Sequence, residues 1–332
     1  MLSTLMPKLS IHKCISICLL SIFSAFFGAS SLYAQEYPSK TIQIITGFPA
    51  GGSVDIVGRH LVQKLNEITG KPFVFENRTG AGGSIAVAAV SAAKPDGYTL
   101  LFSTPGIAIN PVLSKKINYK LDDFEPIALI GEAPLVLLVN STLPIKSINE
   151  LIEYSKNKSN ELRFASAGNG STSHLAMDLI RISVGLQYLH IPYRGGGPAI
   201  IDVMSGRADV AMLPISGGNM QFVRDPRLKA LGQTGSKRSP LALDIPTIEE
   251  AGISPYYSTT WYMVLAPKGI TADSSRYLQS QISKALKTSD LQEKLNAAGV
   301  SVINGSPKDS AMLLQSETKK AQSMKNSGLT IE

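Results

Sequence analysis

Cysteine is almost absent from this sequence of 332 residues: Cys14 and Cys18 are the only two, and both lie near the N-terminus. If that first segment is removed, the remaining chain has no cysteine. Such a chain cannot form a disulfide scaffold, a thiol nucleophile or a cysteine-ligated metal site. Zinc ligation by histidine is not expected either, because His60, His174 and His190 lack the i,i+4 spacing of a zinc site.

Charged residues are few as well, at 17% of the chain, and the 32 Lys and Arg against 25 Asp and Glu are spread without a dense basic run. A surface that binds nucleic acid normally shows clustered basic charge, so we expect no nucleic-acid partner. The hydrophobic content of 44% is too high for a disordered chain and, at this length, predicts about two domains.

The only long apolar run lies in the first 34 residues. Lys8 and Lys13 precede an uncharged, mainly apolar stretch of 14 residues from Ile15 to Gly28, and small residues follow up to Ala34. A membrane-spanning helix needs about 18 or more apolar residues, so a permanent anchor fits less well. The order of charged, apolar and small residues is that of a signal peptide. We therefore expect residues 1–34 to be cleaved after Ala34 and the mature protein to reside in the periplasm.

After residue 35, predicted strands, glycine-rich turns and helices alternate. The β-branched segment 41–47 predicts a buried strand, and Val54, Val57, Leu61 and Leu65 then recur at helical spacing. The same order recurs around further predicted strands at residues 73–76, 98–102, 135–139, 162–165, 188–191, 209–213 and 259–266. Two helices, around Leu278 and Leu291, are expected to close the chain. This alternation is typical of mostly parallel sheets flanked by helices.

We expect the α/β units to form two lobes. The first lobe would consist of residues 35–137 and 259–332, and the second of residues 138–258. Because the middle of the chain forms the second lobe, two strands are expected to cross between the lobes.

Glycine- and serine-rich segments follow five of the predicted strands, at residues 51–53, 80–84, 103–104, 166–174 and 194–198. In open parallel sheets such segments meet at the carboxyl ends of the strands, where the N–H groups of helix N-termini point outward and favour anions. Any one segment is equally typical of an ordinary loop with a helix cap. Five of them, divided between two lobes, favour an anion site between the lobes.

Nucleotide cofactors and hydrolase chemistry find little support. No segment carries GxxxxGK[ST], and the glycine-rich turns lack the third glycine of GxGxxG. A GxSxG elbow is missing too, since Ser173 stands where its second glycine would be needed. The alternative that stays open is a secreted hydrolase with a hydroxyl nucleophile among residues 171–173 and His174 as its base. Otherwise His174 either caps its helix or contacts a ligand, and His190 is expected in the core or a loop.

The sequence resembles a known family in six segments that occur in the same order. These are residues 48–55 (FPAGGSVD), 76–83 (ENRTGAGG), 95–101 (PDGYTLL), 164–171 (FASAGNGS) with His174, 190–195 (HIPYRG) and 244–252 (DIPTIEEAG). They are similar to the extracytoplasmic solute receptors of tripartite tricarboxylate transporters, the TctC-like or Bug receptors. The resemblance implies a two-lobed type II periplasmic binding protein that is monomeric, is not an enzyme and has no cofactor. It also implies a small carboxylate ligand and the membrane components of such a transporter as partners.

The resemblance also implies a ligand site shared by both lobes. The first lobe would contribute a carboxylate loop, with two hydroxyl residues beside it: Phe48, Gly51, Gly52, Ser53 and Asp55, then Ser103 and Thr104. The second lobe would contribute a clamp, with an arginine at its rim: Ser166, Asn169, Ser171, Thr172 and His174, then Arg194.

One segment departs from the family pattern. Where family members often continue with an aromatic residue and Asp-Asn after Asp209 and Val210, this chain has Met212, Leu213 and Pro214. Leu213 cannot accept a hydrogen bond from a ligand ammonium, and an unpaired buried charge is costly. We therefore expect a carboxylate with an apolar, aromatic or neutral polar body rather than an α-amino acid. The alternative is that Leu213 only packs in its strand and another loop, such as that of Asp55, supplies the partner.

Overall fold

The computed structural model describes residues 37–157 and 161–331, so the predicted signal peptide lies outside the described residues. The compact unit that begins at Lys40 contains two sets of paired strands. Within the described ranges, no helix combines the length and the apolar character needed to cross a membrane.

The first set of strands is built around β1 (Ile42–Thr46), which pairs in parallel with β2 (Phe73–Asn77) and β3 (Thr99–Ser103). β9 (Thr259–Pro267) then runs antiparallel to β3. Helices of this part are α2 (Ser53–Thr69), α3 (Ser84–Ser91), α4 (Gly106–Leu113), α9 (Ala272–Leu286) and α10 (Ser289–Ala297). The predicted helix after residue 53 is confirmed, and it ends at Gly70, which has the left-handed backbone typical of a helix C-terminus.

The second set contains β5 (Arg163–Ser166), which pairs in parallel with β6 (Leu189–Pro192) and with β7 (Val210–Pro214). A further strand, β8 (Leu228–Gln233), lies beside β4. Helices of this part are α5 (Ile148–Lys156), α6 (Thr172–Val184), α7 (Gly196–Met204) and the short α8 (Met220–Val223). Ser147 caps α5: its Oγ accepts a hydrogen bond from the Glu150 N–H.

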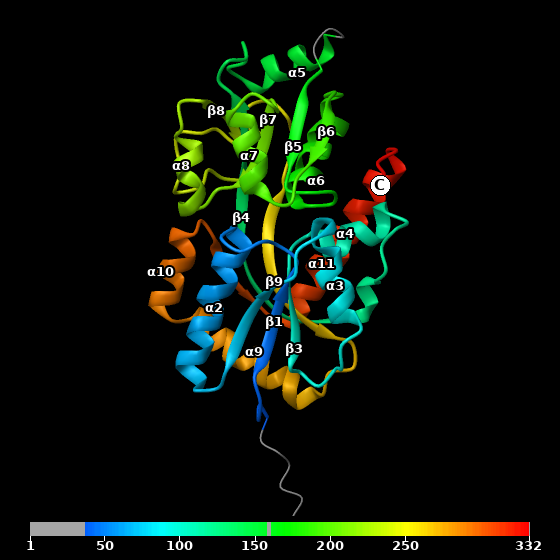
Figure 1. Cartoon of the computed structure of the whole chain (residues 1–332), viewed down its shortest axis with the longest axis vertical. Helices are drawn as coiled ribbons and strands as arrows, with labels where there is room; N and C mark the ends of the chain where they lie inside the picture. Colours follow the sequence, from blue (N-terminus) through cyan, green and yellow to red (C-terminus); the bar gives the residue numbers. More distant parts are fainter. Residues whose placement is uncertain (1–36, 158–160, 332) are drawn as a thin grey trace, which may run out of the picture. The chain divides into compact units, whose positions relative to one another are not determined.

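Strand β4 (Phe124–Asn140) joins the two sets (Figure 1). Its first part pairs with β9 and with β10 (Ser301–Gly305), and its last part pairs with β7 and β8. The strand order is β2-β1-β3-β9-β4-β7-β5-β6. The predicted α/β class is confirmed, although the sheet is mixed because β4 and β9 run antiparallel to their neighbours. β9 pairs with β3 and β4 and begins where the chain returns to the first set.

Alternate residues of β4 belong to different cores. Leu135, Leu137 and Val139 lie in one apolar cluster, whereas Val136 and Leu138 lie in another on the opposite face. Side chains of a strand alternate between faces, so an uninterrupted apolar run means that both faces are covered. The limits of the two lobes, at residues 137/138 and 258/259, stay a prediction.

The end of the chain differs from the prediction. The chain does not close with α9 and α10 but continues through β10 into α11 (Pro307–Asn326). α11 is mostly polar, which hides its apolar stripe, and it packs against α4 through Ala321 and Met324. A capping box of Ser306 and Asp309, with Pro307 in the first turn, marks its start and was the available signal.

Candidate functional site

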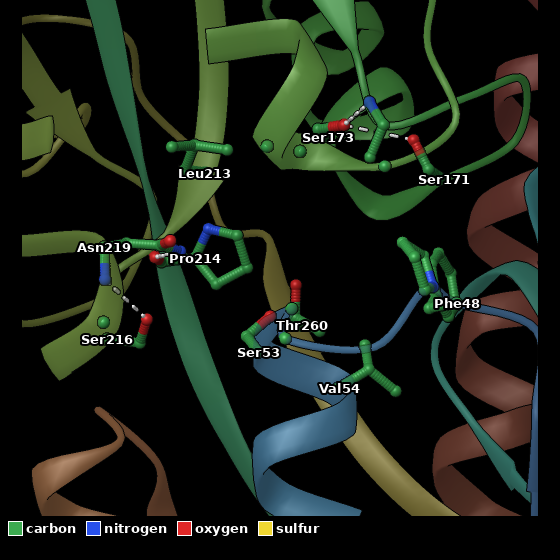
Figure 2. Close-up of a pocket in the computed structure, with 18 of the residues that line it drawn as sticks. Phe48, Ser53, Val54, Ser171, Ser173, Leu213, Pro214, Ser216, Asn219 and Thr260 are labelled. Carbon is green, nitrogen blue, oxygen red and sulfur yellow. Dashed lines mark hydrogen bonds between the residues drawn. The ribbon is translucent and has the colours of Figure 1, made fainter. Parts of the chain in front are cut away.

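A cavity of about 430 Å³ opens at the carboxyl ends of β1, β5, β6 and β7, on the glycine- and serine-rich segments (Figure 2). This volume is in the ordinary range for small-ligand sites. Its walls come from the loop before α2, the starts of α6 and α7, the segment after β7, and Thr260 of β9.

The loop before α2 is held by a buried carboxylate. Asp55 accepts a hydrogen bond of 2.9 Å from the Gly51 N–H and pairs with Arg59, whose Nε lies 2.9 and 3.0 Å from its two oxygens. The Asn77 amide donates both to Asp55 and to the Phe48 carbonyl. Burial alone would raise the pKa of Asp55, but the hydrogen bonds from Arg59, Gly51 and Asn77 lower it overall. The ionised Asp55 therefore holds the loop in place through these hydrogen bonds and does not itself line the cavity.

The start of α6 forms the opposite wall. Ser171 caps the helix, and its Oγ lies 3.1 Å from the Oγ of Ser173, which accepts a hydrogen bond from the Ala167 N–H. Figure 2 shows Ser171 and Ser173 on this wall, across from Ser53.

The electrostatic character of the cavity follows from its helix ends. α2, α6 and α7 all begin at the wall, and Gly52 and Gly195 at the starts of α2 and α7 provide no side-chain cap. Arg194 lies at the same wall, and no Asp or Glu is among the described lining residues. Helix N-termini carry partial positive charge, so this arrangement favours an anion.

His174 and His190 lie behind the cavity wall, where their rings stack at 3.9 Å between centroids. The Nδ1 of His174 accepts a hydrogen bond from the Gly170 N–H, and its Nε2 lies 3.2 Å from Asp178 Oδ2. His174 was expected to cap its helix or to contact a ligand; in the structure its Nδ1 instead holds an N–H of the loop before α6, and the residue does not line the cavity. Asp178, four residues further along the helix, is the residue in the sequence that could have indicated this role.

The contacts of the serines do not support a hydrolase. His174 faces Gly170 and Asp178 rather than the hydroxyls of residues 171–173. A serine–histidine contact does occur between Ser166 Oγ and His190 Nε2, at 2.6 Å. Ser166 is fully buried, however, and does not line the cavity. A substrate in the cavity would have no access to it.

The stacked histidines predict that the folded protein loses stability in acid. Burial, followed by the neighbouring His174, lowers the pKa of His190 from 6.5 to about 4, and burial also lowers that of His174. Between pH 6.5 and about 4, His190 is protonated in the unfolded chain but not in the folded one. The free energy of unfolding should therefore be highest above pH 6.5 and fall as the pH is lowered toward 4. We expect the free energy of unfolding, measured in urea at several pH values, to fall less steeply for His190→Gln over this interval. Parallel profiles of the two proteins would contradict this prediction.

The predicted site residues fall into two groups. The cavity is lined by Phe48, Gly51, Gly52, Ser53, Thr104, Ser171, Thr172 and Arg194. Asp55, Ser103, Ser166, Asn169 and His174 do not line it. Their roles in binding, like those of the first group, stay predictions.

Sequence reasoning singled out Met212, Leu213 and Pro214 of this side of the cavity but missed its other residues. The missed lining residues include Val54, Ile56, Leu135, Ser216, Asn219, Phe222 and Thr260. Leu213 both packs in the core of its strand and lines the cavity, being 2% exposed. Asp55 lies away from the cavity with both oxygens engaged, so the alternative in which it pairs with a ligand ammonium loses support.

Comparison with known proteins agrees with this architecture. The family model described as the tripartite tricarboxylate transporter family receptor, TctC, matches residues 57–329. The solved periplasmic binding protein BugD is 29% identical, with a TM-score of 0.81 over 89% of this chain and 99% of BugD. An R. palustris protein solved with adipate is 29% identical, with a TM-score of 0.83 and the same coverage. MatC of Rhodopseudomonas palustris, solved with malate, is 30% identical, with a TM-score of 0.81 over 87% of this chain and 99% of MatC.

The family match covers most of the strands and helices that carry the cavity, and the similar structures extend over nearly the whole described chain. The resemblance seen in the sequence is thus confirmed, and the chain belongs to the tripartite tricarboxylate transporter receptor family.

Proposed function

We propose that this solute-binding protein captures a small carboxylate in the cavity and delivers it to the membrane components of a tripartite tricarboxylate-type transporter, acting as a monomer. The observation that carries the proposal is the convergence of three helix N-termini and Arg194 on a cavity whose described lining has no acidic side chain. The adipate and malate bound by two similar proteins support a carboxylate as the ligand.

The energetics of such a site are sufficient. A hydrogen bond to a charged group contributes about 1.5–3 kcal/mol, and a helix terminus adds about 0.3–1 kcal/mol. Several such contacts around one carboxylate can offset the cost of association and leave about −8 kcal/mol, which is a micromolar Kd.

The remainder of the ligand would lie against the apolar side of the cavity. Leu135, Met212, Leu213 and Pro214 offer no acceptor side chain there. A ligand ammonium buried against these four side chains would find no acceptor among them. We therefore propose a carboxylate with an apolar, aromatic or neutral polar body.

The test is a binding panel of succinate, malate, adipate, nicotinate, aspartate and glutamate, followed by thermal unfolding and calorimetry. Binding stabilises the folded state by mass action, so a cognate carboxylate should raise the melting temperature. Stabilisation by none of the carboxylates would contradict the proposed function. Tighter binding of aspartate than of succinate would contradict only the assignment of the ligand body.

The hydroxyls of Ser53 and Thr172 are expected to donate to the ligand carboxylate from opposite walls. Replacing either with Ala should weaken binding by about 1–3 kcal/mol, because one charge-assisted hydrogen bond is lost. Calorimetry with the compound of the panel that binds most tightly measures the effect. Ser316→Ala, at an exposed position of α11, is the control. Unchanged affinity in both site variants would show that the hydroxyls do not hold the ligand.

Export is the remaining part of the proposal. We expect the protein isolated from the periplasm to begin at or near Gln35, because Ala34 ends the segment that resembles a signal peptide. Intact-mass spectrometry decides this. Soluble periplasmic protein that retains Met1 would contradict the proposed cleavage.

A further inference from the structure

Thr260 presents a buried hydroxyl without a protein partner. The residue is 3% exposed, and its Oγ1 has no hydrogen-bond partner among residues 37–157 and 161–331. Leaving a buried donor or acceptor unpaired costs stability, so proteins rarely keep one without a reason. A threonine here therefore needs an explanation that packing alone does not provide.

The position of Thr260 in its strand supplies the explanation. Side chains of β9 alternate between faces, and the next residue, Trp261, packs into the apolar cluster that contains Leu101 and Met263. Thr260 points to the other face, where it lines the cavity. Figure 2 shows its hydroxyl oxygen turned toward the space enclosed by the lining residues.

We infer that Thr260 is a ligand-binding residue whose hydroxyl donates a hydrogen bond to an oxygen atom of the bound carboxylate solute. The inference rests on the proposed function and extends it to a residue of the strand that pairs with β4. Because Thr260 lines the cavity and its Oγ1 has no partner among the described residues, we assign a ligand atom as the missing partner.

The Thr260 hydroxyl also restricts what the ligand must present. Leu135, Met212 and Leu213 make part of the lining apolar, and Thr260 adds a hydroxyl from β9 to this lining. A ligand with an oxygen at this point is favoured, whereas one with a methyl group there leaves the hydroxyl unpaired. Thr260 would thus select among carboxylates of similar size.

The experiment compares Thr260→Val with Thr260→Ser. Valine keeps the shape of threonine and removes the hydroxyl, and serine keeps the hydroxyl. Thr46→Val is the matched control, because the Oγ1 of Thr46 is also buried without a partner among the described residues but does not line the cavity. Each protein is titrated with succinate, malate, adipate and nicotinate by calorimetry, and its melting temperature is measured without ligand.

We expect Thr260→Val to lower the affinity for the tightest-binding of these probes about tenfold, which is about 1.4 kcal/mol. The affinity of Thr260→Ser should stay within about threefold of wild type. Thr46→Val should bind like wild type. Neither valine variant should lower the melting temperature without ligand, because neither hydroxyl has a protein partner to lose among the described residues. That result separates a ligand contact from a structural role.

Three results would overturn the inference. If a probe binds wild type and Thr260→Val binds it equally well, Thr260 does not contact the ligand although the proposed function stands. If no probe binds wild type, the proposed function fails, and the inference fails with it. A Thr260→Val protein that melts well below wild type without ligand would show that the hydroxyl has a structural role.

Discussion

Asp55→Ala is expected to lower the free energy of unfolding by about 2–3 kcal/mol and to weaken ligand binding at least tenfold. The carboxylate of Asp55 is 4% exposed and accepts hydrogen bonds from Gly51, Arg59 and Asn77. Its removal leaves the Gly51 N–H unpaired and frees the loop whose residues line the cavity. Because the Arg59 side chain is 52% exposed, water compensates part of the lost ion pair, which keeps the expected cost below that of a fully buried pair.

Two further variants locate the cause. Asp55→Asn keeps the shape of the side chain and one acceptor oxygen, but its NH₂ group would face the N–H donors that now bind the second oxygen. We therefore expect losses of stability and affinity between those of wild type and Asp55→Ala. Asp273→Ala is the control, because that side chain is 87% exposed and its ion pair is with the exposed Arg276; its effect should stay within about 0.5 kcal/mol. Urea unfolding and calorimetry measure both quantities. Wild-type affinity in Asp55→Ala would show that the loop keeps its conformation without the carboxylate.

Elements defined by local signals could be predicted from the sequence. The end of α2 at Gly70 and the cap of α5 at Ser147 depend on residues within one helical turn. The buried strands follow from their β-branched and apolar runs. By contrast, α4 contains Pro111 and α11 is largely polar, and the two helices are stabilised by packing on each other. Contacts between elements so far apart along the chain leave no local pattern, so α4 was missed; α11 was missed although its capping box gave a local signal for its start.

The position of the cavity was predictable, but the direction of several side chains was not. The carboxyl ends of parallel strands meet by topology, which places the loops that follow β1, β5 and β6 together. Asp55 and His174, however, lie in the first turn of their helices and turn back to hold loop N–H groups. Thr260 and Leu213 reach the cavity from strands, and only the three-dimensional register decides which face they share.

Two of the loops approach each other so closely that a glycine is required at one of them. A Cβ atom on Gly82, in the turn between β2 and α3, would lie 2.0 Å from the carbonyl oxygen of Asn169, in the loop between β5 and α6. Gly82 does not line the cavity, so a substitution there leaves the ligand contacts in place. If the two predicted lobes open and close around the ligand, the overlap arises only in the closed arrangement.

Gly82→Ala is therefore expected to weaken binding at least tenfold, or about 1.4 kcal/mol, by disfavouring the closed arrangement. Small-angle scattering with a saturating ligand of the panel should show less compaction than in wild type. Gly70→Ala is the matched control: both glycines have φ of +62°, so the backbone strain is alike, but nothing lies within 4 Å of a Cβ on Gly70. It should lower stability by about 1–2 kcal/mol and leave affinity unchanged. Equal affinities of the two alanine variants would mean that the approach of Gly82 to Asn169 has no part in ligand capture.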